Sequence, residues 1–251
     1  MSERIFLAGA AGAVGSALTP LLVGAGYEVY GTTRHLDRTD AIRAAGAHPI
    51  LVDVFDRATL ADAIERVAPA IVIHQLTDLP PALDPTRMAD AVARNARIRA
   101  EGTANLVTAA RAAGCAHIVA QSIAWAYAAG QAPYSESQPL DTAAEGARAI
   151  TVNGVVALER HVLAFNDCGG VGTVLRYGNL YGPGTGRDVA QGASPLHVDA
   201  AAWAALLAVQ RATSGVFNIA EDHAEVSNRK AKRELGWRPD LRLPMPENAR
   251  D

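Results

Sequence analysis

The sequence predicts an α/β protein of the Rossmann type, with a doubly wound parallel sheet in a single domain that spans residues 1–251. Short apolar runs alternate with longer alanine-rich helical patterns, which is typical of a parallel sheet covered by helices on both faces. Right-handed crossovers between successive strands then place a ligand at the carboxyl ends of the strands. The expected strands lie near residues 4–8, 27–33, 49–52, 70–74, 116–121 and 171–176.

Helices are expected between these strands. The first runs from about Ala13 to Val23, because Gly24-Ala25-Gly26 supplies a C-terminal glycine signal. The stretch 84–113 has a helical pattern throughout, apart from Gly102. After the sixth strand the pattern loosens into a loop at 182–186, a helix at 199–211 and a further strand at 215–220.

The bulk composition narrows the classes of partner. The formal net charge is −3, and no run of Lys or Arg suggests nucleic acid or an anionic membrane. No charged leader precedes an apolar stretch at the N-terminus, and no apolar run approaches the length that spans a bilayer. We therefore expect a cytoplasmic protein that acts on a small molecule.

The two cysteines predict no special chemistry. Cys115 and Cys168 are far apart in the sequence, and neither belongs to a Cys-x-x-Cys or Cys/His cluster. Both are expected to be ordinary buried thiols. Neither a metal site nor a disulfide is predicted.

A glycine-rich turn directly follows the first strand. Gly9, Gly12 and Gly15 have the spacing G-x-x-G-x-x-G and open the first helix. Glycine lets the backbone N–H groups approach a pyrophosphate, and the helix N-terminus then faces its negative charge. We predict a dinucleotide site that includes Ala13 and Val14. The alternative is a turn that serves only close packing.

This turn and its position resemble the extended short-chain dehydrogenase/reductase superfamily, in its NAD(P)-dependent epimerase/dehydratase-like branch. The resemblance implies a nicotinamide cofactor and, in most members, catalysis by a Tyr-x-x-x-Lys pair. The only lysines here are Lys230 and Lys232, and no tyrosine has a lysine four residues on. The resemblance therefore implies an atypical member, in which the cofactor site is kept and the usual proton donor is not.

The end of the second strand bears on the choice of cofactor. NAD-selective relatives usually carry Asp or Glu there to bind the ribose hydroxyls, whereas this chain has Arg34. A guanidinium can hold a 2′-phosphate with a forked, charge-assisted pair, so NADP is favoured and NAD stays possible. The alternative is that Arg34 is solvated and Asp37 reaches the ribose.

Two further segments match cofactor contacts of the family. Asp53 and Val54 stand where relatives contact adenine. The segment Gln75, Leu76 and Thr77 follows the fourth strand, where the chain of relatives passes the ribose and pyrophosphate. The preceding residue, His74, is expected to be structural rather than a catalytic base.

The catalytic region can be aligned with the family through Gln121–Tyr127 and through Glu159. Counting back from Glu159 places Val155 at the family's lysine and Thr151 at its tyrosine. Valine cannot lower the pKa of a neighbouring acid, and the hydroxyl of threonine is a very weak acid. The candidate catalytic residues are therefore substitutes from this region: Ser122, Tyr127 and Thr151. The alternative for Tyr127 is a packed aromatic with its hydroxyl bonded to backbone.

A second strong match is the run from Arg176 to Gly184, which resembles the family's Arg-x-x-Asn-Val-Tyr-Gly-Pro loop beside the nicotinamide. The resemblance implies cofactor contacts for Tyr177, Gly178 and Leu180, and a substrate contact for Asn179. The alternative is that Arg176 and Asn179 only hold the loop.

The C-terminal part, from about 177 to 251, is expected to form a reduced substrate lobe. Only about ten residues separate Gly186 from His197, where relatives usually have a long segment. His197 is expected to tie the next helix to the sheet, and Asp199 to cap that helix.

A homodimer is expected from the resemblance, because relatives commonly pair through the helices that correspond to 84–113 and 143–168. The arginines of the first of these helices are expected to be solvated or to lie at the subunit contact: Arg94, Arg97 and Arg99.

Together these observations predict an oxidoreductase or epimerase/dehydratase-like enzyme that prefers NADP(H) and uses a non-standard proton donor. The main alternative is a catalytically silent NADP(H)-binding sensor or partner protein of the same fold. A non-redox lyase or isomerase is less favoured, because the glycine turn is intact. The fold alone does not decide among them.

Overall fold

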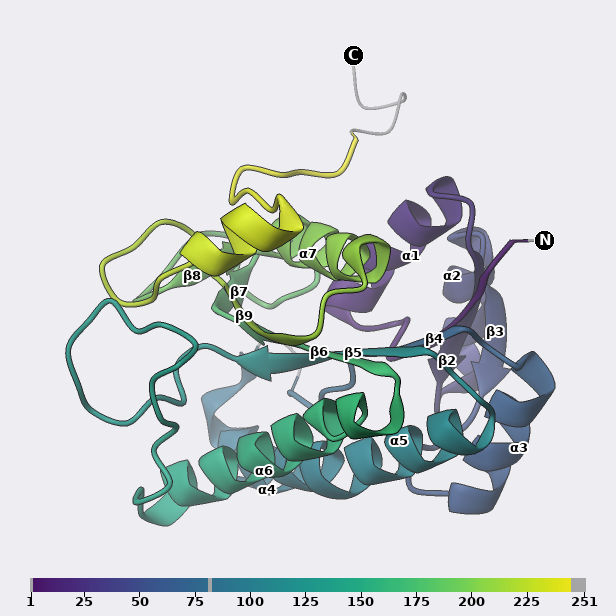
Figure 1. Ribbon diagram of the computed structural model, residues 1–251, viewed down its shortest axis with the longest axis horizontal. Helices are drawn as coiled ribbons and strands as arrows, with labels where there is room; N and C mark the ends of the chain where they lie inside the picture. Colours follow the sequence, from purple (N-terminus) through teal and green to yellow (C-terminus); the bar gives the residue numbers. More distant parts are fainter. Residues whose placement is uncertain (1, 81–82, 245–251) are drawn as a thin grey trace.

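The computed structural model describes residues 2–80 and 83–244 and is built around one seven-stranded sheet (Figure 1). The strand order is β3-β2-β1-β4-β5-β6-β9, and every neighbouring pair is parallel. The α/β Rossmann-type fold and its expected strands are confirmed. The strands are β1 (Arg4–Ala8), β2 (Glu28–Thr33), β3 (His48–Leu51), β4 (Ile71–His74), β5 (His117–Ile123), β6 (Val171–Tyr177) and β9 (Gly215–Ile219).

Helices cover both faces of the sheet, as Figure 1 shows. Side chains alternate between the faces of a strand, so Ile5 and Leu7 of β1 join one core while Phe6 and Ala8 join the other. One layer holds α1 (Ala13–Gly24) and α7 (Val198–Arg211), with α2 (Thr39–Ala44) beside it. The opposite layer holds α3 (Arg57–Val67), α4 (Met88–Arg97), α5 (Thr103–Ala112) and α6 (Gly146–Leu163).

The long helix expected over 84–113 forms, although it is not uniform. A short 3₁₀ turn (Pro85–Arg87) precedes α4, and a π-turn (Ile98–Gly102) joins α4 to α5. Gly102 does not interrupt the helix. A Cβ atom at Gly102 would lie 3.1 Å from a methyl carbon of Val54, so this glycine reflects close packing against the loop after β3.

Two short strands in the C-terminal part were not predicted. β7 (Asn179–Tyr181) and β8 (Pro195–His197) form a separate two-stranded parallel sheet. The cap at the start of α7 also differs from the expectation. His197 is the capping residue, and its Nδ1 accepts the N–H of Asp199 at 3.1 Å. Asp199 instead accepts the N–H of Leu243 at 3.1 Å.

The structure also bears on membrane-spanning helices and on the burial of the two cysteines. None of the described helices is long and apolar enough to cross a bilayer. Cys115 is buried, as expected, and burial raises the pKa of its thiol to about 11. Cys168 is exposed, contrary to expectation, because it lies in a 3₁₀ turn after α6 rather than in a core element.

Candidate functional site

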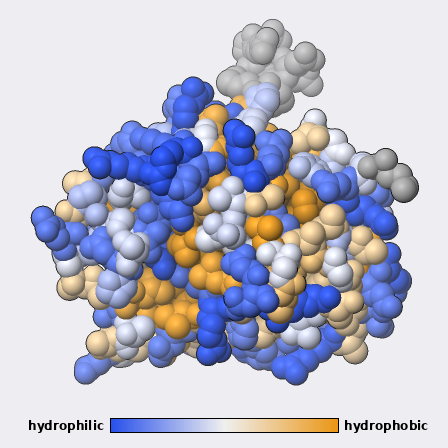
Figure 2. All heavy atoms as spheres, in the orientation of Figure 1, coloured by the Kyte–Doolittle hydropathy of each residue, from blue (hydrophilic) through white to orange (hydrophobic). Residues whose placement is uncertain are grey.

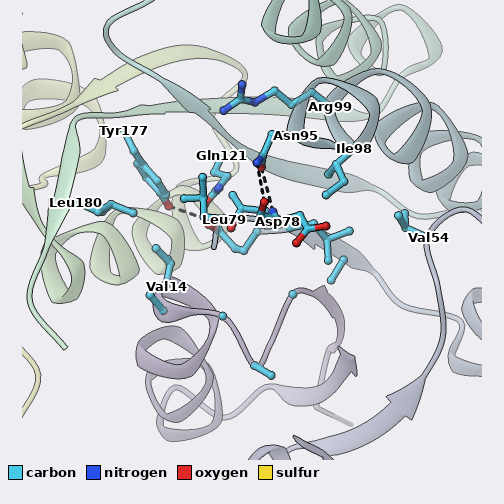
Figure 3. Close-up of a pocket in the computed structure, with 18 of the residues that line it drawn as sticks. Val14, Val54, Asp78, Leu79, Asn95, Ile98, Arg99, Gln121, Tyr177 and Leu180 are labelled. Atoms are coloured by element: carbon cyan, nitrogen blue, oxygen red, sulfur yellow. Dashed lines mark hydrogen bonds between the residues drawn. The ribbon is translucent and has the colours of Figure 1, made fainter. Parts of the chain in front are cut away.

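A cavity of about 600 Å³ lies at the carboxyl ends of the central strands (Figure 3). Its volume is in the range of cofactor and ligand sites. The walls come from the glycine turn after β1 and from the segments that follow β2, β4, β5 and β6. The cavity is therefore at the position that the doubly wound topology predicts.

The glycine turn is shaped by contacts that leave no room for side chains. Gly9 has a φ of +92°, and a Cβ atom there would lie 2.8 Å from the carbonyl oxygen of Gln75. A Cβ atom on Gly15 would lie 2.1 Å from the carbonyl oxygen of Gly9. The N–H of Gly12 donates to that same carbonyl at 3.0 Å. Tight packing thus brings the N-terminus of α1 to the cavity, where its N–H groups can meet an anion.

Gln75 gives an independent indication of a ligand. Its Nε2 donates to the Tyr177 hydroxyl at 3.3 Å, whereas its Oε1 is the one buried side-chain polar atom without a hydrogen-bond partner in the described chain. Buried polar atoms are normally paired. Because Gln75 lines the cavity, a donor on a bound dinucleotide, such as a hydroxyl or amide, would satisfy this atom. The residues present therefore fit that cofactor.

The predicted cofactor residues gather around this cavity. Gly15 is the exception, because it does not line the cavity; its lack of a side chain lets α1 pack closely against the glycine turn. The predicted substrate residue Asn179 also lines the cavity, and its Nδ2 donates to the carbonyl of Ala193 at 2.6 Å. The predicted cofactor residues in the cavity wall are Gly9, Gly12, Ala13, Val14, Arg34, Asp53, Val54, Gln75, Leu76, Thr77, Tyr177, Gly178 and Leu180.

The segment after β2 is basic where it faces the cavity. Arg34, His35 and Arg38 line it, and Asp37 is not among the lining residues. Arg34 Nη2 lies 3.2 Å from Oδ2 of Asp78, which also accepts a hydrogen bond from Arg94 Nε at 3.1 Å. Asp78 therefore keeps a cationic partner if Arg34 turns toward a ligand.

The three predicted catalytic residues are not brought together in the cavity. Ser122 lines it, but its Oγ donates to Oε1 of Glu159 at 2.8 Å. Neither Tyr127 nor Thr151 is a lining residue, and both are buried. Val155 is fully buried in a small apolar cluster with Ala126 and Val152. This cluster occupies the place where the resemblance puts the lysine.

Tyr127 belongs to a buried polar network behind the cavity. Its hydroxyl accepts a hydrogen bond from Arg176 Nη1 at 2.8 Å and donates to Asn218 Oδ1 at 2.6 Å. Arg176 also donates from Nε and Nη2 to the two carboxylate oxygens of Glu159, at 2.8 and 2.7 Å. Burial raises the pKa of Tyr127, and the charge of Arg176 offsets this in part. Arg176 is thus a structural cation that joins β6 to α6.

His74 is structural, as expected. It is fully buried, its Nε2 lies 3.1 Å from Oγ1 of Thr103, and its Nδ1 accepts the N–H of Leu76 at 3.2 Å. Burial lowers its pKa to about 4, and the charge of Arg99 adds to this effect. A histidine held neutral in this way orients the segment after β4.

The sequence analysis missed part of the cavity wall. Arg99 was expected at the surface, yet it lines the cavity (Figure 3). Regular helical spacing does not point to Arg99, because the π-turn (Ile98–Gly102) changes the register of the helix at this residue. Apolar residues of the wall were missed as well: Leu79, Pro80, Leu83, Met88, Ile98, Ile123 and Trp125.

Comparisons with known proteins agree with this geometry. A model of the NAD dependent epimerase/dehydratase family matches residues 5–237. A curated relative, a 3-diazoavenalumate denitrifying reductase from a Streptomyces species, is 41% identical over 242 residues, which cover 87% of this chain and 76% of the relative.

Solved structures share the fold. A UDP-glucose 4-epimerase from Thermotoga maritima, solved with UDP-glucose, has a TM-score of 0.75 at 19% identity, over 94% of each chain. The Bordetella bronchiseptica enzyme WbmG, solved with NAD, has a TM-score of 0.71 at 18% identity, over 97% of this chain and 91% of that one. The glycine turn, the cavity at the strand ends and the family match over most of the chain lead to one conclusion: the protein belongs to the NAD-dependent epimerase/dehydratase family.

Proposed function

We propose that this protein is an NADP(H)-preferring reductase whose substrate accepts a hydride without a proton from a protein side chain. One observation carries the proposal. The predicted dinucleotide residues other than Gly15 line the cavity, while the positions that the resemblance assigns to the proton-donating tyrosine and its lysine hold Thr151 and Val155, neither of which lines it.

Apart from His35, which lies beside Arg34 in the segment after β2, the described residues of the cavity offer no acid suited to proton transfer. Its ionisable side chains include Tyr177, whose hydroxyl donates to the carbonyl of Ala201 at 3.2 Å and whose pKa is raised by burial. The carboxylate of Asp78 is held between two arginines. The remaining ionisable lining residues are Arg34, His35, Arg38, Asp53, Arg99 and Arg187. Reduction of a ketone, or epimerisation through one, would need a positioned acid or base.

A diazo substrate removes this requirement. The 41% identical relative is named for the reductive removal of nitrogen from a diazo compound. A reduced nicotinamide supplies a hydride, and a hydride plus a diazonium cation (R–N₂⁺) balances as R–H plus N₂, with no proton taken up or released. We therefore propose that the substrate is an organic acid that carries a diazonium group. The protein's contribution is to bind and orient this substrate and the cofactor, and to exclude water from them.

The preference for NADP(H) is supported by the basic segment after β2. Arg34 and Arg38 both line the cavity, and a forked guanidinium binds a phosphate more strongly than it binds a ribose hydroxyl. Arg94 is positioned to keep Asp78 paired when Arg34 binds the phosphate, since its Nε is already 3.1 Å from that carboxylate.

The first experiment is a fluorescence titration of the protein with NADPH and with NADH. Arg34→Ala should weaken NADPH binding by about 10- to 100-fold, the usual effect of one charge-assisted contact, and should leave NADH binding nearly unchanged. Arg43→Ala is the matched control, because Arg43 is exposed on α2 and pairs only with Asp40. Equal binding of the two nucleotides by the unmodified protein would remove the NADP preference.

The second experiment tests the reaction. NADPH deuterated at its transferable position is mixed with an arenediazonium carboxylate, and N₂ release and deuterium in the denitrified product are followed by mass spectrometry. Enzyme-dependent deuterium transfer supports the proposal. Tight NADPH binding with no transfer to the diazonium acid would favour the alternative of a catalytically silent NADP(H)-binding protein.

A further inference from the structure

Arg99 differs from the other arginines of its helix. It lies in the π-turn between α4 and α5, a type of helix irregularity that is frequent at functional sites. Arg94 pairs with Asp78 and Arg97 pairs with Glu101. In the described chain Arg99 has no ion pair and no side-chain hydrogen bond, although it is only partly exposed.

The charge of Arg99 is uncompensated and faces the cavity. Burial lowers its pKa to about 10, so the guanidinium is still a cation at neutral pH. Two acidic residues line the cavity, Asp53 and Asp78. Asp53 accepts the N–H of Phe55 at 2.9 Å, and Asp78 is held by Arg34 and Arg94. No described carboxylate of the cavity wall therefore pairs with Arg99. A partly buried guanidinium without a counter-charge is stabilised by a bound anion.

The cofactor has its own cations on other walls. Arg34 and Arg38 lie beside the end of β2. Arg187 lines the cavity from the 182–187 loop, which reaches the glycine turn: a Cβ atom on Gly184 would lie 3.5 Å from Cα of Ala13. Figure 3 shows Arg99 on the wall formed by α4 and the π-turn, together with Asn95 and Ile98 and across the cavity from Val14 of α1. The anion at Arg99 is thus separate from the phosphates near the glycine turn.

The wall around Arg99 is mostly apolar. Leu79 and Trp125 line the cavity and are 48% and 45% exposed, which is high for large apolar side chains. Ile98 and Ile123 line it as well. Among the polar groups of this wall, Ser122 donates to Glu159 and Asn95 is bonded to Asp78 and Ala91, whereas Gln121 has no side-chain hydrogen bond in the described chain. Such a wall suits a flat apolar body and offers few partners for the hydroxyls of a sugar.

We propose that Arg99 anchors the carboxylate of the substrate, and that the substrate is a flat, unsaturated or aromatic monocarboxylate whose body lies against Leu79, Ile123 and Trp125. This inference rests on the proposed reductase function and deepens it by naming the substrate class. The guanidinium forms a bidentate pair with the carboxylate, and the apolar wall excludes water from the end of the substrate that is reduced.

The test uses binding rather than turnover. Cinnamate and cinnamamide are two flat ligands that differ in charge, and their dissociation constants are measured by calorimetry with and without saturating NADP⁺. The unmodified protein should prefer cinnamate by about 10- to 100-fold. Arg99→Met should abolish that preference and leave NADPH binding unchanged, and Arg99→Lys should restore part of it. Arg97→Met is the matched control, since Arg97 is exposed two residues away.

Stability supplies a second readout. Because Arg99 has no described partner, Arg99→Met should raise the midpoint of thermal unfolding of the ligand-free protein, whereas a residue with a structural role would lower it. A lowered midpoint for Arg99→Met overturns the proposal, as does equal or absent binding of the two ligands, or a loss of NADPH affinity. Failure of the unmodified protein to bind NADPH, with an Arg99-dependent preference for cinnamate retained, would instead defeat the reductase function alone.

Discussion

Gly15 is the residue on which the geometry of the cofactor turn depends most directly. Gly15→Ala places a Cβ atom 2.1 Å from the carbonyl oxygen of Gly9, so the turn or α1 must shift. We expect destabilisation of about 1–3 kcal/mol and loss of most NADPH affinity, measured by urea unfolding and by fluorescence titration. Gly24→Ala is the control, because a Cβ atom there meets nothing within 4 Å, and it should stabilise α1 by roughly 0.5–1 kcal/mol. Similar behaviour of the two variants would contradict this account of the turn.

A variant of Tyr127 tests whether a side chain of the protein donates a proton in the reaction. The Tyr127 hydroxyl is held by Arg176 and Asn218 outside the cavity. Tyr127→Phe should therefore lower the free energy of unfolding by about 1–2 kcal/mol while it leaves hydride transfer within about twofold, as the proposed function expects of a reaction without a protein acid. Tyr134→Phe is a suitable comparison, because Tyr134 stacks on Tyr127 at a centroid distance of 5.3 Å and, among the described residues, its hydroxyl bonds only to the backbone of Gly130. A loss of turnover confined to Tyr127→Phe would identify this tyrosine as the donor.

Between elements, the pair of Glu159 and Arg176 ties α6 to β6. Both side chains are almost fully buried. Glu159→Gln would leave the guanidinium without its counter-charge, and we expect a loss of about 3–5 kcal/mol in the free energy of unfolding. Glu101→Gln breaks the exposed pair with Arg97 and should leave that free energy nearly unchanged. Chemical denaturation of the two variants would show whether the buried pair has this structural role.

Two buried histidines make the sheet sensitive to acid. His74 bonds to Thr103 of α5, and His117 bonds to Thr173 of β6. Burial lowers the pKa of each from 6.5 to about 4. Between these pH values the unfolded chain binds more protons than the folded one, so stability falls as the pH falls below 6.5 and the loss levels off near pH 4.

The magnitude of this acid effect can be measured. Each histidine should lower the free energy of unfolding by about 1–2 kcal/mol at pH 5 relative to pH 7. His117→Asn should remove about half of the difference between urea unfolding at these two pH values. An unchanged difference in that variant would mean that His117 does not carry the acid sensitivity.

At the scale of the whole molecule, the expected homodimer stays a prediction. α4 and α6 pack closely: a Cβ atom on Gly154 would lie 2.9 Å from Cα of Ala96. Figure 2 shows apolar surface toward the lower left of this face, where α4 and α6 lie in Figure 1, and Ile150 of α6 is 46% exposed. Ile150→Glu should shift the mass measured by light scattering from dimer to monomer. Leu51→Glu, on the edge strand β3, should not.

The sequence was sufficient for the sheet and for the glycine side of the cavity, because both depend on local patterns. Apolar runs define the seven main strands, and the spacing of Gly9, Gly12 and Gly15 defines the turn. The three-residue strands β7 and β8 are too short for any periodicity to appear. The position of Arg99 depends on the π-turn, which changes the helical register locally, and on a cavity assembled from several distant segments.

The apolar cluster of Ala126, Val152 and Val155 has a consequence for how this protein could change over evolutionary time. Val155 is fully buried there, so a lysine at that position would have to place an ammonium group among aliphatic side chains before any tyrosine at position 151 could make use of it. A lysine introduced alone at position 155 would therefore lower the stability of the fold, and it would have no catalytic use until a tyrosine stood at position 151. Under the proposed function, this closed cluster would therefore keep the site committed to reactions that need no tyrosine–lysine pair.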